Sequence, residues 1–127
     1  MKIPTQEWIK KAENDWRVAL NEWGLHDPVY DAICFHAQQC AEKYLKAWLI
    51  EQGIDFPKSH DLFAIANLCL PSLADVQKHL EALSDLSQSA VETRYPGNDP
   101  NLQEVETSIN TARTIRELIR KKLLLPD

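Results

Sequence analysis

Apolar residues recur at intervals of three and four along most of the chain, which is the spacing of one face of an α-helix. Residues 5–23 carry the first such stripe, which consists of Trp8, Ile9, Ala12, Trp16, Ala19, Leu20 and Trp23. Thr5 is a candidate N-cap and Gly24 follows the last periodic residue, so the pattern predicts a helix over residues 5–23. Its three tryptophans indicate a face that lies in the core or in a subunit contact.

A second helix is predicted from Asp27-Pro28, a capping carboxylate followed by proline at the first helical position, to the residue before Gly53. This segment is apolar over most of its circumference, which is typical of a central helix. Its main buried face is predicted to comprise Tyr30, Ile33, Ala37, Cys40, Ala41, Tyr44 and Trp48.

A loop precedes a short third helix over about residues 60–70, which Ser59 caps and Pro71 ends. Lys58 and His60 lie beside the free backbone N–H groups at the start of this helix, and such an arrangement can bind an anion. The alternative is an ordinary helix cap with polar neighbours.

Ser72 and Asp75 resemble a capping box, which opens a fourth helix reaching to about residue 89. Asp99-Pro100 repeats the cap-plus-proline start and opens a fifth helix. The predicted core residues of these two helices are Leu73, Val76, Leu80, Leu83, Leu86, Val105, Ile109, Ala112, Ile115, Ile119 and Leu123.

No segment alternates with a period of two for long enough to be a strand, and the chain contains no repeat. We therefore predict one domain over residues 1–127, an all-α, up-and-down helical bundle of four longer helices plus one short helix. The composition agrees, because 127 residues that are 44% hydrophobic suffice for a core, and 3 glycines are few for a turn-rich β-sandwich.

The net charge of −5 is spread evenly, with 7 basic and 10 acidic side chains in residues 1–63 and 7 and 9 in residues 64–127. This balance excludes a protein that grips duplex DNA along a whole face, since such binding needs a continuous cationic surface. A local cationic pocket for a nucleotide or a short RNA is compatible with it.

Three cysteines, Cys34, Cys40 and Cys69, form no Cys-x-x-Cys pair, and we predict buried thiols in a reducing cytosol. No metal-binding or phosphate-loop motif occurs, so neither a metal nor a cofactor is expected. The N-terminal segment does not resemble a signal peptide, and no apolar run is long enough to span a membrane. These features predict a soluble, cytoplasmic protein.

His36, Gln39 and Lys43 form a polar stripe along the border of the buried face of the second helix. A histidine and a lysine seven residues apart lie on the same side of a helix, where they can hold a phosphate. The alternative is a histidine whose hydrogen bonds are satisfied between helices, next to a lysine that extends to solvent.

Arg94 and Tyr95 lie in a loop that Pro96 restricts and Gly97 allows to turn sharply. Such a loop can fix the guanidinium and the phenol at one end of the bundle. Alternatively, Arg94 caps a helix C-terminus or pairs with Glu92.

Three segments together resemble the HEPN domain family: Phe35–Gly53, Pro57–Leu62 and Val91–Gly97. The resemblance implies a compact α-helical bundle that is commonly a symmetric dimer. It also implies a small prokaryotic protein of the kind that accompanies a minimal nucleotidyltransferase, in toxin–antitoxin-like or nucleotide-binding pairs.

Many HEPN proteins are metal-independent ribonucleases with an arginine followed, after four to six residues, by a histidine. The arginine stabilises phosphate charge and the histidine assists proton transfer at the ribose hydroxyl. Arg94 matches the arginine, but Asp99, Pro100 and Asn101 occupy the positions of the histidine. The resemblance therefore implies a HEPN protein without the usual nuclease motif.

Three hypotheses follow. The first is a HEPN module that binds a nucleotide or a nucleotidyltransferase partner, as a homodimer, through His36, Gln39, Lys43, Lys58, His60, Arg94 and Tyr95. The second is a ribonuclease toxin with a rearranged site, in which Arg94, His36 and His60 are the catalytic candidates. The third is a structural dimerisation module with no ligand. The first two require Arg94 and His36 to share one crevice.

Overall fold

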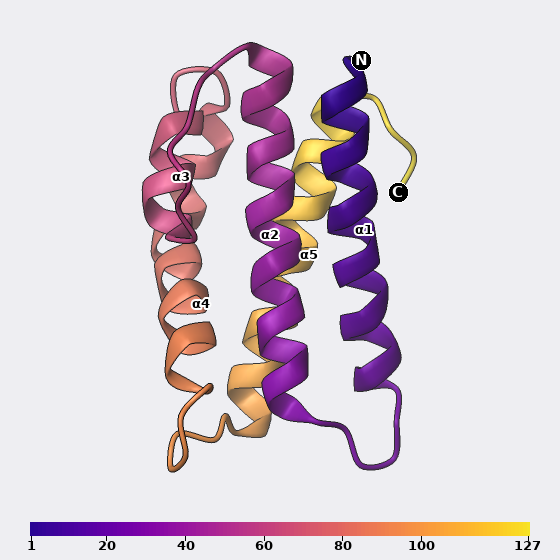
Figure 1. Ribbon diagram of the computed structural model, residues 1–127, viewed down its shortest axis with the longest axis vertical. Helices are drawn as coiled ribbons and strands as arrows, with labels where there is room; N and C mark the ends of the chain where they lie inside the picture. The colour runs from indigo at the N-terminus through magenta and orange to yellow at the C-terminus, as the bar shows by residue number, and fades with distance from the viewer.

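The computed structural model describes residues 1–127, which form helices joined by loops and no strand (Figure 1). The helices are α1 (Ile3–Trp23), α2 (Tyr30–Gln52), α3 (Leu62–Cys69), α4 (Leu80–Glu92) and α5 (Leu102–Lys122), with a 3₁₀ segment η1 (Ala74–His79) before α4. The predicted all-α bundle with one short helix is confirmed.

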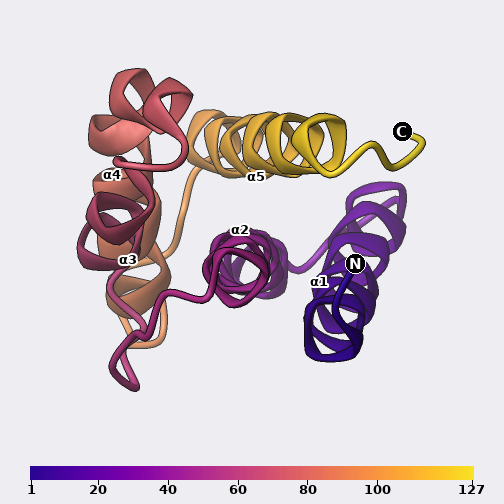
Figure 2. The same cartoon turned by 90° about the horizontal axis from the view of Figure 1, so that it is seen from above.

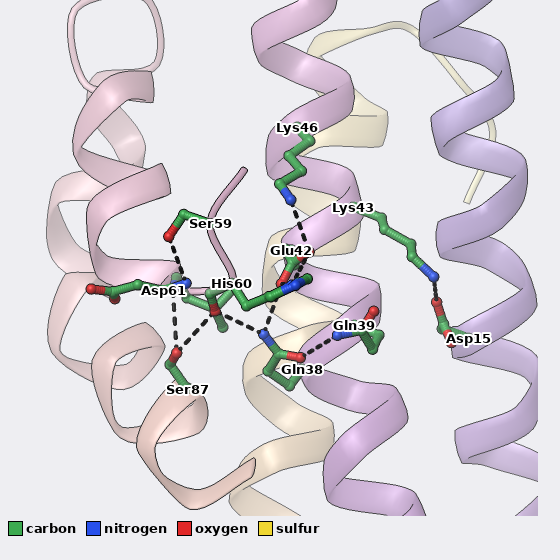
Figure 3. A network of polar contacts seen from close by, with 11 residues as sticks. Asp15, Gln38, Gln39, Glu42, Lys43, Lys46, Ser59, His60, Asp61 and Ser87 are labelled. Carbon is green, nitrogen blue, oxygen red and sulfur yellow. Dashed lines mark hydrogen bonds and ion pairs between the residues drawn. The ribbon is translucent and has the colours of Figure 1, made fainter. Parts of the chain in front are cut away.

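Helix α2 lies at the centre of the bundle. Seen from above, α1 flanks it on one side and α3 with α4 on the other, while α5 packs along a third side (Figure 2). No helix covers the fourth side of α2. We call this side the open face of α2, and it carries Gln39, Glu42, Lys43 and Lys46 (Figure 3). Phe35 and His36 lie on the same side by helical spacing.

One hydrophobic cluster of 26 buried residues holds the helices together, and α2 contributes more of them than any other helix. Nearly all predicted core positions are buried or partly buried. Leu20 is the exception, because it lies on the outer side of α1 with 37% of its surface exposed. None of the helices has both the length and the apolar character needed to cross a membrane.

The predicted starts of the first two helices are wrong by about one turn or less. Helix α1 begins before Thr5, whose hydroxyl instead donates to Glu51 at the end of α2 (2.8 Å). Helix α2 begins after Asp27-Pro28 and has no side-chain cap. The predicted end of α2 is confirmed, since Gly53 adopts the left-handed conformation (φ 72°) that favours glycine there.

The cap of α3 is Asp61 and not Ser59, because the Asp61 carboxylate accepts from two backbone N–H groups of the first turn. The capping box predicted at Ser72 is also absent. Its hydroxyl accepts a hydrogen bond from the Trp48 indole (2.9 Å), and the chain then forms η1 before α4 begins. Contacts with α2 thus replace the local cap.

Helix α5 begins after the predicted Asp99-Pro100 start. Its cap is Asn101, whose side chain accepts from the Glu104 backbone N–H (2.8 Å) while Glu104 accepts from the Asn101 N–H. This is a complete capping box. It fixes the end of the loop that carries Arg94.

Candidate functional site

Asp15 of α1 holds two of the predicted site residues on α2. Its carboxylate accepts from His36 Nδ1 (2.8 Å) with one oxygen and from Lys43 Nζ (2.6 Å) with the other. The Asp15 side chain is 11% exposed, whereas those of His36 and Lys43 are 28% and 23% exposed. Asp15 therefore holds the His36 and Lys43 side chains from the α1 side, and both side chains remain accessible at the open face.

The Asp15 bond defines the tautomer of a neutral His36. A carboxylate that is already paired with Lys43 only accepts hydrogen bonds, so the proton must lie on Nδ1. The second ring nitrogen, Nε2, makes no hydrogen bond within the chain and can accept a proton or a hydrogen bond from a ligand. The chemistry of the pair is that of an oriented imidazole base.

Asp15 was not among the predicted site residues, although the sequence contains a signal for it. Asp15 lies three residues after Ala12 and four before Ala19, on the apolar stripe of α1. A carboxylate on a buried stripe needs a partner, because burying an unpaired charge is costly. Its partner was not deducible, since it comes from another helix.

A second cluster lies on the same face and is centred on Glu42, which is only 2% exposed. Its carboxylate accepts from Lys46 Nζ (3.0 Å), from His60 Nδ1 (3.0 Å) and from the Gln38 amide (3.1 Å). Gln38 also donates to the His60 carbonyl, and Gln39 donates to Gln38 (Figure 3). The loop before α3 is thus bound to α2 at His60, whose side chain remains 80% exposed.

Two aromatic rings close the upper end of the open face. The Lys46 ammonium lies 5.6 Å from the centre of the Trp8 ring and 5.7 Å from that of Phe56. The two rings meet edge to face, and Lys46 is only 5% exposed. Lys46 therefore stabilises the packing of α1 and the loop against α2 and is not accessible to a ligand.

Arg94 reaches the lower end of the open face. Its guanidinium lies 5.2 Å from the centre of the Phe35 ring, and the same ring meets His36 edge to face at 5.2 Å. Arg94 makes no ion pair, so the alternative pairing with Glu92 does not form. Arg94 and His36 flank one ring but do not contact each other.

Lys58 and Tyr95 lie apart from these contacts. Lys58 is exposed and its side chain makes no hydrogen bond, and Tyr95 is 63% exposed. At the start of α3 the Asp61 carboxylate occupies the backbone N–H groups that were predicted to bind an anion. The alternative of an ordinary cap describes this segment.

The open face thus brings together His36, Gln39, Lys43 and, through Phe35, Arg94. No group of three or more histidine, cysteine or acidic side chains is placed to hold a metal ion.

Comparison with known proteins places the chain in a family. The HEPN domain matches residues 5–122. The fold is similar to the crystal structure of TT1696 from Thermus thermophilus, with 27% identity, a TM-score of 0.72 and coverage of 93% of this chain and 97% of the other. It is also similar to ST0689, an archaeal HEPN homologue, with 28% identity, a TM-score of 0.70 and coverage of 97% and 99%. No curated protein matches. From its sequence and its fold, the chain belongs to the HEPN domain family.

Proposed function

We propose that this HEPN protein binds the phosphate-bearing part of a nucleotide or a short RNA on the open face of α2. The observation that supports this proposal is the pair of bases, His36 and Lys43, which Asp15 orients toward a side of the bundle without a covering helix. Arg94 lies at the same side with no ion-pair partner.

The charges of the open face favour an anion even though the whole chain is acidic. Three cations (Lys43, Lys46 and Arg94) face two carboxylates (Asp15 and Glu42), which leaves one positive charge when the histidines are neutral. A guanidinium donates two parallel hydrogen bonds to phosphate, and His36 and Lys43 can supply further donors.

Titration calorimetry with ATP, GTP and a short single-stranded RNA tests the proposal. We expect at least one ligand to bind, and Arg94→Ala to weaken it by about tenfold or more through the loss of charge-assisted hydrogen bonds. Arg17→Ala is the matched control, because Arg17 is exposed on α1 and makes no ion pair. Absence of heat with every ligand, while circular dichroism shows a folded protein, contradicts the proposal.

The variant Asp15→Asn tests the orienting carboxylate. We expect NMR of the imidazole nitrogens to show His36 protonated at Nδ1 in the natural protein and a mixture of tautomers in the variant. Ligand affinity should fall with it, since His36 and Lys43 lose their common anchor. An unchanged affinity would place the ligand elsewhere.

The partners implied by the resemblance belong to the same proposal. A homodimer and a nucleotidyltransferase protein are the expected assembly, and the ligand is then a nucleotide that such a partner carries. Light scattering measures the mass in solution. Co-expression with a nucleotidyltransferase encoded beside this chain, followed by size-exclusion chromatography, tests the complex, and separate elution contradicts it.

A second candidate function is metal-independent ribonuclease activity, which the Asp15–His36 pair favours. His36 Nε2 would take the proton of a ribose 2′-hydroxyl while that oxygen attacks phosphorus. The bond to the 5′-oxygen breaks, that oxygen leaves as a hydroxyl with a proton from water, and the other product is a 2′,3′-cyclic phosphate. Arg94 would stabilise the phosphate charge. Incubation with total RNA in EDTA separates the candidates: cleavage that disappears in Arg94→Ala and in His36→Ala supports the enzyme, and intact RNA supports binding alone.

A further inference from the structure

A groove with a volume of about 430 Å³ lies between α4 and α5. These two helices are inclined to each other (Figure 2), and the loop 93–101 joins them at the lower end (Figure 1). All lining residues belong to α4, α5 and the cap before α5, so the groove is separate from the open face of α2.

The groove is acidic. Asp85 and Glu92 of α4 and Glu104 of α5 line it, and no lysine or arginine does. Glu92 accepts from Gln88 and Glu104 belongs to the capping box, but Asp85 has no hydrogen-bond or ion-pair partner. An anionic ligand is therefore repelled here, and a cationic one is attracted.

The floor of the groove contains polar groups that lack partners. Thr111 is 8% exposed and its hydroxyl makes no hydrogen bond, and Ser89 Oγ is buried without a partner. The Thr111 hydroxyl is open to solvent in the groove, whereas an unpaired buried group such as Ser89 Oγ costs free energy. A bound segment that supplies donors and acceptors would remove that cost.

The side chains of the floor are small, which lets another helix approach closely. Ala82 and Ser89 on α4 lie opposite Thr107 and Thr111 on α5. Asp85 and Glu92 are seven residues apart on one side of α4, a spacing of about 10 Å along the axis. A helix with lysine or arginine at every third and fourth position presents cations at the same spacing.

We propose that the α4–α5 groove docks a lysine- or arginine-rich helical segment of a protein partner. The carboxylates at the rim attract a cationic segment, and the small side chains of the floor allow the backbone of that segment to approach closely. This surface shares no residue with the nucleotide site.

The test uses the ¹⁵N-labelled full chain and an Ala-Leu-Lys peptide of about 18 residues, long enough to form a helix. The matched peptide has glutamate at every lysine. We expect the lysine peptide to shift the amide signals of Asp85, Ser89, Glu92, Thr107 and Thr111, with an affinity that falls as salt is added. The glutamate peptide should shift none of them.

The double variant Asp85→Asn/Glu92→Gln should weaken the lysine peptide by about tenfold, as the loss of two interface charges does. Glu7→Gln/Glu117→Gln is the control with the same change of charge, at two exposed positions outside the groove. Nucleotide binding at the open face should be the same in both double variants, so the two proposals can fail separately.

Three results with the peptide overturn this inference. They are no shift up to millimolar peptide, shifts at residues outside the groove, and an equal loss of affinity in the control variant. Without peptide, the groove signals could instead shift as the protein concentration rises. That result would assign the groove to a second copy of the chain and reject the heterologous partner.

Discussion

Glu13 of α1 joins three helices through one carboxylate. It accepts from Arg116 Nε and Nη2 of α5 (2.7 and 2.8 Å) and from the Tyr44 hydroxyl of α2 (2.6 Å), with Arg120 close by. Burial alone would raise the Glu13 pKa. The hydrogen bonds from Arg116 and Tyr44 and the charges of both arginines outweigh burial and hold the pKa below its ordinary value of 4.5.

We predict that Glu13→Gln destabilises the protein by about 1–2 kcal/mol at pH 7. The value is below that of a fully buried pair, because 32% of the Glu13 side chain is exposed to water. A lowered pKa stabilises the fold fully above the ordinary pKa and loses that effect as pH falls through the folded value. The difference between natural protein and variant should therefore shrink below about pH 4.

Urea unfolding at pH 7 and pH 3 measures this effect. Glu7→Gln is the control, since Glu7 is exposed on the same helix and makes no ion pair. A difference between the natural protein and Glu13→Gln that is the same at both pH values would show that the ionised carboxylate is not the source of the stability.

At the candidate site, the sequence predicts which residues of one helix act together but not what they contact. The seven-residue spacing of His36 and Lys43 placed both on one side of α2, and in the structure both bond to one carboxylate. Asp15 comes from another helix, and the Phe35 ring lies between Arg94 and His36. Such relations depend on how helices pack, which spacing within one helix does not encode.

At the scale of the element, the helices were predictable and their ends were not. Apolar residues at intervals of three and four indicate the buried side along a whole helix, so one position that does not fit leaves the prediction unchanged. A cap depends on one hydrogen bond. Thr5 and Ser72 are good caps by residue type, but Glu51 and Trp48 bind their hydroxyls from α2. Tertiary contacts thus override local preference at the ends.

The turn that ends α5 holds one residue in an unfavourable backbone conformation, and a substitution can relieve this cost. Leu124 has a positive φ of 60°, while its N–H and that of Leu125 donate to carbonyls of the last turn. This turn favours glycine, because the left-handed conformation costs an L-residue about 1–2 kcal/mol. The Leu124 side chain is 91% exposed and contributes little in return.

We predict that Leu124→Gly raises the free energy of unfolding by about 0.5–1 kcal/mol, since the extra entropy of glycine in the unfolded chain cancels part of the gain. Leu125→Gly should lower it, because Leu125 packs against the core and its φ is not positive. Thermal unfolding of the two variants gives the comparison. A loss of stability in both would mean that the turn does not persist in solution.

At the scale of the whole molecule, one hydrophobic core links every helix. The reactivity of the three cysteine thiols measures how this core opens. Cys34 and Cys40 lie in α2 and Cys69 in α3, and all three are fully buried in the 26-residue cluster. Burial raises the pKa of each thiol, that of Cys69 to about 12. Only the thiolate reacts, so a folded chain presents neither an accessible nor an ionised sulfur.

We predict that no thiol reacts with Ellman's reagent in the native protein at pH 8. As urea is added, all three thiols should become reactive together, with the same free energy of opening. The reason is that α3 is not a separate unit, because its buried residues Leu62, Ile65 and Ala66 belong to the same cluster as those of α2. Mass spectrometry of partially labelled samples counts the modified sites. Molecules labelled at none or at all three indicate one cooperative unit, whereas early labelling of Cys69 alone would mean that α3 opens from a stable pair of α1 and α2.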